Sequence, residues 1–186
     1  MNLKYNYFLL FIFLYIQNVK AAETIFLYKG TFSRTISINE LYNFKKTKIP
    51  SQKLKSLIKI TNQEEKKLHE VLSYKIEVPI TTSSKLMNSK IGEVFLTRLS
   101  KIIHPNKILN KEISIKAMRS GIILSSYNNN QKINLIDFFK AYPNKNIAID
   151  LNALRKSLKK AESLKELIEF YSDSPFKKLK DGSSNI

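Results

Sequence analysis

Residues 23–38, ETIFLYKGTFSRTISI, determine how the fold begins. β-forming residues lie on both sides of Lys29-Gly30, and apolar and polar side chains alternate after the glycine. Glycine reaches positive φ without strain, which a tight reversal between two strands requires. We therefore predict a β-hairpin over these residues. Two strands are not stable alone in water, so the hairpin is expected to pack on the segments that follow.

Short amphipathic helices are predicted after the hairpin. Ser37-x-x-Glu40 has the pattern of a capping box, in which each side chain satisfies a free backbone N–H of the first turn. Apolar residues at three-and-four spacing indicate one buried face in each helix. The expected helices begin at Ser37, at Ser51, at Thr61 with a second capping box to Glu64, at Ser89 with an end at Ile103, near Glu112 with an end near Ser126, and at Asn134.

The remaining pattern completes the fold class. In the helix that begins at Ser89, Ile91 and Val94 belong to the expected buried stripe. Residues 147–149 are predicted to be briefly extended, and Asp150 is expected to cap the longest helix, from Leu151 to about Tyr171. The predicted fold is mainly α, with an N-terminal β-hairpin packed on a bundle of short helices and one long C-terminal helix.

The first 21 residues have the pattern of a secretory signal peptide. An uncharged run from Tyr5 to Ile16 follows Lys4 and leads into Val19-Lys20-Ala21, a small-x-small cleavage pattern. We predict cleavage after Ala21 and export to the periplasm or the thylakoid lumen. The alternatives are an uncleaved anchor or a buried core helix, although the run is shorter than the ~20 residues of a membrane-spanning helix. The expected division is 1–21 signal peptide, 22–172 mainly helical domain and 173–186 disordered tail.

Composition narrows the classes of partner. The formal net charge of +17 is typical of nucleic-acid binding, but 28 of the 32 basic residues are lysine, whereas specific recognition favours the arginine fork. Export would also separate the chain from nucleic acid, so we expect no nucleic-acid partner. Weak, salt-sensitive attraction to an anionic membrane surface remains an alternative. Without cysteine, an exported chain has no disulfides and depends on apolar burial for stability.

Patterns that carry catalytic or metal chemistry are sparse in this sequence. It has no G-x-S-x-G, and Ser120-Gly121, the nearest fragment, lies in a helical pattern with no histidine after it. His69 and His104 are the only imidazoles, and we expect surface or helix-cap roles for both. Glu64 and Glu65 are expected to favour a helix dipole rather than to act as acid and base. We therefore predict no catalytic, cofactor-binding or metal residues and no cofactor.

Arg119 is unusual because it interrupts the apolar pattern of Ile115, Met118 and Ile122 in a chain that uses lysine almost everywhere. A planar fork can satisfy a carboxylate or the carbonyls at a helix end, which a lysine does less well. We predict that Arg119 is partly buried against such a group. The alternative is an ordinary surface arginine.

Several apolar and capping segments together resemble a known family. They are the opening Ala22 to Gly30 with Ser33-x-x-Ile36-Ser37-Ile38-x-x-Leu41, then Ile91-Gly92-Glu93-x-x-Leu96, Ile115-x-x-Met118-Arg119-x-x-Ile122-Ile123, and Leu135-x-x-Phe138-Phe139-x-x-Tyr142-Pro143-x-x-x-Ile147-x-Ile149-Asp150. This order resembles the cyanobacterial domain of unknown function that precedes an α/β-hydrolase domain in longer proteins. The resemblance covers roughly residues 22–160 and implies the N-terminal domain only, with no catalytic residue to carry over.

We therefore expect an exported, non-catalytic binding or accessory domain. The resemblance implies an exported α/β hydrolase or another protein as its partner. Two alternatives stay open: an ester or lipid hydrolase, by association with the family, and a basic module that binds the membrane surface.

Overall fold

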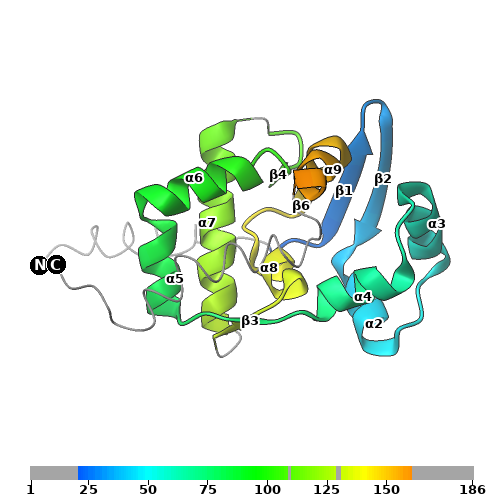
Figure 1. Ribbon diagram of the computed structural model, residues 1–186, viewed down its shortest axis with the longest axis horizontal. Coiled ribbons are helices and arrows are strands. Elements are labelled where there is room, and N and C mark those ends of the chain that lie inside the picture. The colour runs from blue at the N-terminus through cyan, green and yellow to red at the C-terminus, as the bar shows by residue number, and fades with distance from the viewer. Residues whose placement is uncertain (1–20, 109, 129–130, 161–186) are drawn as a thin grey trace, which may run out of the picture.

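A computed structural model describes residues 21–108, 110–128 and 131–160. The predicted tail 173–186 and the predicted signal peptide, apart from residue 21, lie outside them. The described residues form eight helices and six strands, so the mainly α expectation is confirmed. Helices α5, α6 and α7 stand at one end of the molecule, and the hairpin of β1 and β2 lies toward the other end with α2, α3 and α4 (Figure 1).

The helices and strands follow one another in the order and with the bounds given next. The helices are α2 (Ile38–Thr47), α3 (Gln52–Thr61), α4 (Glu65–Ser73), α5 (Ile80–Met87), α6 (Lys90–Leu99), α7 (Lys111–Asn128), α8 (Leu135–Ala141) and α9 (Leu151–Lys160). The strands are β1 (Thr24–Lys29), β2 (Phe32–Ser37), β3 (Ile76–Glu77), β4 (Ile103–Pro105), β5 (Lys132–Ile133) and β6 (Asn146–Asp150).

The predicted hairpin is present and forms half of a four-stranded sheet. β1 and β2 pair antiparallel around Gly30, whose φ of 59° is the left-handed conformation that the turn requires. The strand order is β2-β1-β6-β4, with β6 parallel to β1 and antiparallel to β4. The predicted extended segment at 147–149 is therefore confirmed, but it lies inside the sheet rather than apart from it.

Local capping signals position most of the predicted helices. Ser37 and Glu40 form the complete capping box at the start of α2, and Ser51 caps α3. Asn134 accepts two backbone N–H groups at the start of α8, and Asp150 does the same for Asn152 and Ala153 at the start of α9. These four predictions are confirmed. The predicted length of the C-terminal helix is not tested, because the part beyond Lys160 lies outside the described residues.

Two local predictions are wrong, and one helix is absent from the prediction. Thr61 does not cap α4, because it is the last residue of α3 and its hydroxyl donates to the Leu57 carbonyl at 2.8 Å. The helix predicted to end at Ile103 ends at Leu99, and the chain then enters β4. Helix α5 was not predicted; its short sequence, ITTSSKLM, is rich in serine and threonine, which are weak helix formers.

The core lies between the sheet and the helices. Ile25, Ile36 and Ile147 come from neighbouring strands and are at most 2% exposed. They belong to one apolar cluster with residues of α2, α3 and α7. The hairpin is therefore packed on helices, as its sequence predicts.

Candidate functional site

The outward surface of α6 departs most from what its sequence predicts. Ile91 and Val94 are 63% and 54% exposed, so the expectation that they face the core is wrong. The opposite side of α6 is the buried one because Gly92 lies directly against α5: a Cβ there would come 1.9 Å from the Leu86 carbonyl oxygen. Leu96, one turn further on, is fully buried. Close backbone packing through glycine therefore turns the two aliphatic side chains outward.

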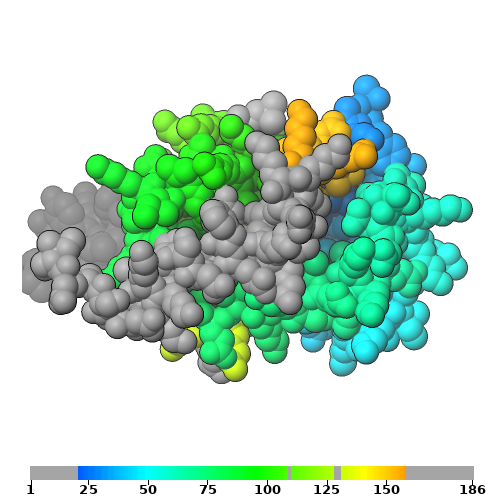
Figure 2. Space-filling model, in the orientation of Figure 1, coloured from blue at the N-terminus to red at the C-terminus, as the bar shows by residue number. Residues whose placement is uncertain are grey.

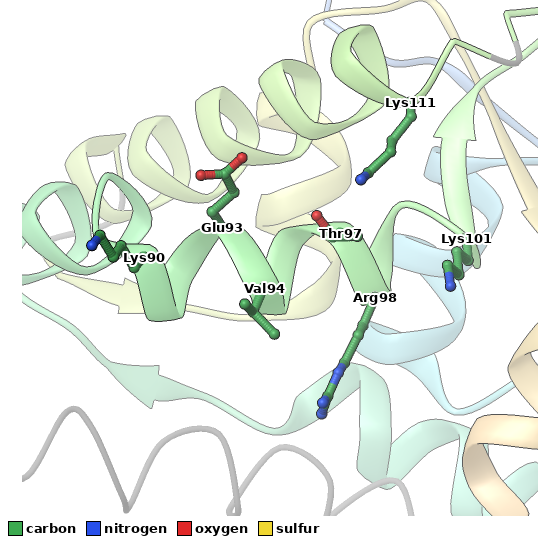
Figure 3. Close-up of a pocket in the computed structure, with 7 residues that line it drawn as sticks. All are labelled: Lys90, Glu93, Val94, Thr97, Arg98, Lys101 and Lys111. Carbon is green, nitrogen blue, oxygen red and sulfur yellow. The ribbon is translucent and has the colours of Figure 1, made fainter.

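Basic side chains surround this exposed apolar pair. We call the surface formed by Lys90, Ile91, Val94, Arg98, Lys101 and Lys111 the α6 face. An open groove of about 540 Å³ runs along it, lined by five of these residues together with Glu93 and Thr97. Figure 3 shows Glu93 and Thr97 on the side of α6 toward α7, with Val94 and Arg98 on the other side. Residues of α6, in green, lie at the surface of the molecule (Figure 2).

The charges of the α6 face favour an anionic or acidic partner. Its four cations stand against the single carboxylate of Glu93, and none of the four makes an ion pair within the described residues. Exposed cations keep most of their hydration, so each would attract an acidic group weakly and in a salt-dependent manner. The exposed aliphatic pair adds apolar area that a partner can cover.

A second polar cluster joins three strands of the sheet. The hydroxyl of Tyr28 lies 2.9 Å from Nε2 of His104, and Nδ1 of His104 lies 3.0 Å from the Pro105 carbonyl oxygen. Because that carbonyl only accepts, neutral His104 carries its proton on Nδ1 and accepts the Tyr28 hydroxyl at Nε2. Asp150 is the register partner of Tyr28. Burial, followed by the charge of Asp150, raises the pKa of Tyr28.

This cluster has the chemistry of a structural contact. A raised pKa keeps the Tyr28 hydroxyl protonated at neutral pH, so it acts as a hydrogen-bond donor. Asp150 already accepts two backbone N–H groups at the start of α9. His104 is 7% exposed, so the expected surface or helix-cap role is wrong: the residue lies in β4, at the edge of the sheet.

The other histidine has a local role. Nε2 of His69 lies 3.0 Å from the Lys45 carbonyl oxygen, within the last turn of α2. Its ring meets the buried Phe44 ring edge-on, with 5.9 Å between the centroids. His69 is half-buried and links α4 to α2, which fits the expected helix-cap role more closely than a surface one.

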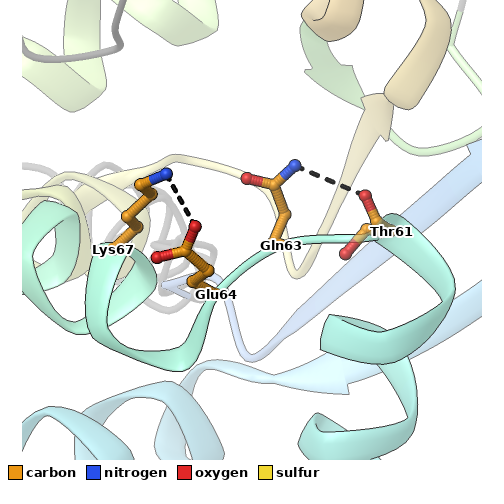
Figure 4. A network of polar contacts seen from close by, with 4 residues as sticks. All are labelled: Thr61, Gln63, Glu64 and Lys67. Atoms are coloured by element: carbon orange, nitrogen blue, oxygen red, sulfur yellow. Dashed lines mark hydrogen bonds and ion pairs between the residues drawn. The ribbon is translucent and has the colours of Figure 1, made fainter.

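The carboxylates at the start of α4 are likewise structural. Glu64 pairs with Lys67 at 2.8 Å, and the side-chain amide of Gln63 donates to the Thr61 carbonyl (Figure 4). Both partners of the ion pair are about two-thirds exposed, so the contact adds little to stability. Glu65 lies in the first turn of α4, where a negative charge favours the helix dipole.

Arg119 has the environment that its sequence position predicts. It is half-buried on α7, and its Nε donates to the Met87 carbonyl at 2.9 Å. Met87 is the last residue of α5, so the guanidinium satisfies a helix-end carbonyl. Ser120, the neighbouring residue on α7, is half-buried. No group of three or more histidine, aspartate or glutamate side chains capable of holding a metal occurs within the described residues.

A family model matches residues 21–150, which is most of the chain and spans both polar regions described above. The chain belongs to this family. It is described as alpha/beta hydrolase of unknown function (DUF1400). Neither the curated proteins nor the solved structures contain a match to the chain. Among the described residues, none of the helices has both the length and the apolar character needed to span a membrane.

Sequence reasoning missed both regions of interest. Ile91 and Val94 have the spacing of a buried stripe, and only the glycine beside them indicates that another face packs closely. His104 and Tyr28 are 76 residues apart in sequence, so no local pattern joins them. Asp150, in contrast, could be singled out from the sequence because it precedes a predicted helix at the capping position.

Proposed function

We propose that this chain is an exported, non-catalytic binding module that uses the α6 face to contact an acidic surface on a partner protein. One observation carries the proposal: two exposed aliphatic side chains lie among four cations, of which two are on α6, one is in the turn after it and one begins α7. A partner with acidic groups around an apolar centre would gain both apolar burial and charge attraction there.

The identity of the partner is proposed from the resemblance stated in the sequence analysis. The resemblance to a domain that precedes a hydrolase domain in longer cyanobacterial proteins favours an exported α/β hydrolase. A hydrolase that approaches with carboxylates around an apolar centre would complement the α6 face.

The binding role is tested by photo-crosslinking in cells that produce the protein. A photoreactive phenylalanine analogue at Val94 is expected to give one dominant adduct with an exported protein, identified by mass spectrometry. The same analogue at Ile49, which is 73% exposed and far from α6 in sequence, is the matched control. The adduct should disappear in Arg98→Glu with Lys101→Glu. Equal labelling from both positions would refute the proposal.

Export has its own test. The intact mass of the protein recovered outside the cytoplasm should correspond to a chain that begins at Ala22. Recovery of only the full-length chain, bound to membranes, would show that the segment is an uncleaved anchor and not a cleaved signal.

An ester or lipid hydrolase is the second candidate, favoured by the description of the family. Turnover of short-chain nitrophenyl esters by the purified protein, abolished by Ser120→Ala, would establish it in place of the binding role. The third candidate is a membrane-surface module. Binding to anionic vesicles but not to zwitterionic ones, lost in Arg98→Glu with Lys101→Glu, would establish that role.

A further inference from the structure

A dense group of lysines lies at the connection between α2 and α3. Residues 41–63 contain six lysines and neither aspartate nor glutamate. None of the six forms an ion pair with another residue in the described part of the chain. Clusters of roughly four to eight basic residues on an amphipathic helix are typical of proteins that bind anionic lipid headgroups. The six residues are Lys45, Lys46, Lys48, Lys53, Lys55 and Lys59.

An exposed isoleucine lies in the middle of this group. Ile49 is 73% exposed, more than either aliphatic side chain of the α6 face. Local bonds hold the loop in place: the backbone N–H of Ile49 donates to the Thr47 hydroxyl oxygen at 3.2 Å, and Ser51 caps α3 two residues later. Pro50 is buried and restricts the backbone further. The structure therefore presents one apolar side chain outward among the lysines.

Helix α3 extends the basic surface away from the loop. Its apolar side, which includes Leu54 and Leu57, is buried in the core. Its lysines are exposed, as are the two that come just before Ile49. In Figure 1, α3 lies at the opposite end of the molecule from α5 and α6. We call the surface formed by the following exposed residues the α3 face: Lys46, Lys48, Ile49, Lys53, Lys55 and Lys59.

The chemistry of the α3 face fits a lipid surface better than a fixed site on a folded protein. All of its cations are lysines, which are point charges without the directional fork of arginine, and mobile headgroup phosphates need no fixed geometry. Glu40 lies beside this surface, but its carboxylate already accepts hydrogen bonds from the Ser37 backbone and the Ser51 hydroxyl. One carboxylate beside five lysines leaves the α3 face strongly positive.

We propose that the α3 face docks the molecule on a bilayer that contains anionic lipids, with Ile49 inserted among the headgroups. Each lysine close to such a surface strengthens binding by roughly five-fold, and salt screens the attraction. One aliphatic side chain is only a shallow anchor, so the lysines supply most of the affinity. The α6 face, at the opposite end of the molecule, stays open to the acidic partner, and this inference does not depend on the proposed function.

The absence of tryptophan allows a site-specific test with the purified protein. Ile49→Trp introduces a single indole, whose fluorescence should shift to shorter wavelength on vesicles made of equal parts phosphatidylglycerol and phosphatidylcholine, because the ring leaves water. Vesicles of phosphatidylcholine alone should cause no shift. Val94→Trp, at an exposed position on the α6 face, is the matched control and should keep its emission unchanged. No shift at position 49, or an equal shift at position 94, would overturn the proposal.

Charge removal tests whether the position of the lysines matters or only the net charge. A triple variant of the α3 face should weaken co-sedimentation with the same anionic vesicles at least ~10-fold. A triple variant of the α6 face removes the same number of charges and should bind within about two-fold of the unaltered protein. Equal weakening in both would show that net charge alone attracts the vesicles and would refute the docking face. The variants are Lys53→Gln, Lys55→Gln and Lys59→Gln in the first, and Arg98→Gln, Lys101→Gln and Lys111→Gln in the second.

The membrane contact and the proposed function fail in different ways. A partner adduct from position 94 without a fluorescence shift at position 49 would refute the membrane contact alone. A shift at position 49 without a partner adduct would refute the binding role of the α6 face and leave the membrane contact in place. Loss of vesicle binding in the α6 variant only would move the membrane contact to the α6 face.

Discussion

The two ends of the molecule are held together by different kinds of contact. At the sheet end, local side-chain caps at Ser37 and Asp150 fix where β2 and β6 pass into helices. At the helical end, contacts between different helices dominate: Gly92 of α6 lies against the Leu86 carbonyl of α5, and Arg119 of α7 donates to the Met87 carbonyl of α5. The points where strands pass into helices at the sheet end are therefore predictable from short patterns, whereas the helical end depends on how α5, α6 and α7 meet.

Gly92→Ala, at the helical end, should cause the largest loss of stability. The new methyl group would lie 1.9 Å from the Leu86 backbone oxygen, so α5 and α6 must separate. Overpacking against backbone costs about 3 kcal/mol in the free energy of unfolding. Urea denaturation should show the loss as a lower midpoint.

Gly121→Ala is the control for that substitution. Its Cβ would approach the Phe138 side chain at 3.0 Å, and a ring can shift where a backbone cannot. Its destabilisation should be clearly smaller than that of Gly92→Ala. Equal midpoints for the two variants would mean that the α5–α6 contact is not the close one.

Arg119→Lys should have the next largest effect. A lysine lacks the Nε–H that donates to the Met87 carbonyl, which leaves the end of α5 less well satisfied. We expect a loss of about 1 to 3 kcal/mol in the free energy of unfolding. An unchanged urea midpoint would remove the structural role of Arg119, and Arg155→Lys on α9 is the matched control at an exposed arginine.

Removing the hydroxyl from each of two tyrosines should change stability in opposite directions. The Tyr28 hydroxyl has His104 as a partner, whereas the Tyr142 hydroxyl is fully buried and has no hydrogen-bond partner in the described part of the chain. Burial raises the pKa of Tyr142 well above its usual value, which keeps it neutral. Tyr28→Phe should lower the free energy of unfolding by about 1 kcal/mol, and Tyr142→Phe should raise it by a similar amount. Thermal unfolding of both variants distinguishes them, and the same sign for both would contradict these roles.

Glu40 makes the stability of the sheet end slightly dependent on pH. Partial burial opposes the charge, but hydrogen bonds from the Ser37 backbone and the Ser51 and Ser37 hydroxyls outweigh it and lower the pKa. A carboxyl with a lowered pKa stabilises the fold above its unfolded value of 4.5 and loses that contribution as the pH falls through the folded value.

Glu40→Gln should therefore cost up to about 1 kcal/mol at pH 7 and less at pH 3. Urea midpoints of the variant and the unaltered protein, compared at both pH values, measure the change. A difference that stays constant with pH would exclude the carboxylate as its source. Glu65→Gln, at an exposed carboxylate, is the control.

The contrast between local and distant contacts explains what the sequence could predict. The hairpin, the capping box at Ser37 and the cap at Asp150 each involve residues within a few positions of one another. The pairing of β6 with β1 joins residues more than a hundred positions apart, and no local pattern records it. For Arg119, the residue type predicted the kind of partner, but only the structure identifies it as the Met87 carbonyl.

The smallest expected change in stability concerns the α6 face. Because the spacing of Ile91 and Val94 is that of a buried stripe, the sequence alone predicts a large loss of stability when both become serine. Both side chains are more than half exposed, so the structure instead predicts a change of less than about 0.5 kcal/mol in the free energy of unfolding. Leu96→Ser, on the fully buried side of α6, is the control that should unfold readily. A large loss in the double variant would place the α6 face within the core and remove it as a binding surface, whereas an unchanged urea midpoint leaves its apolar pair available to a partner.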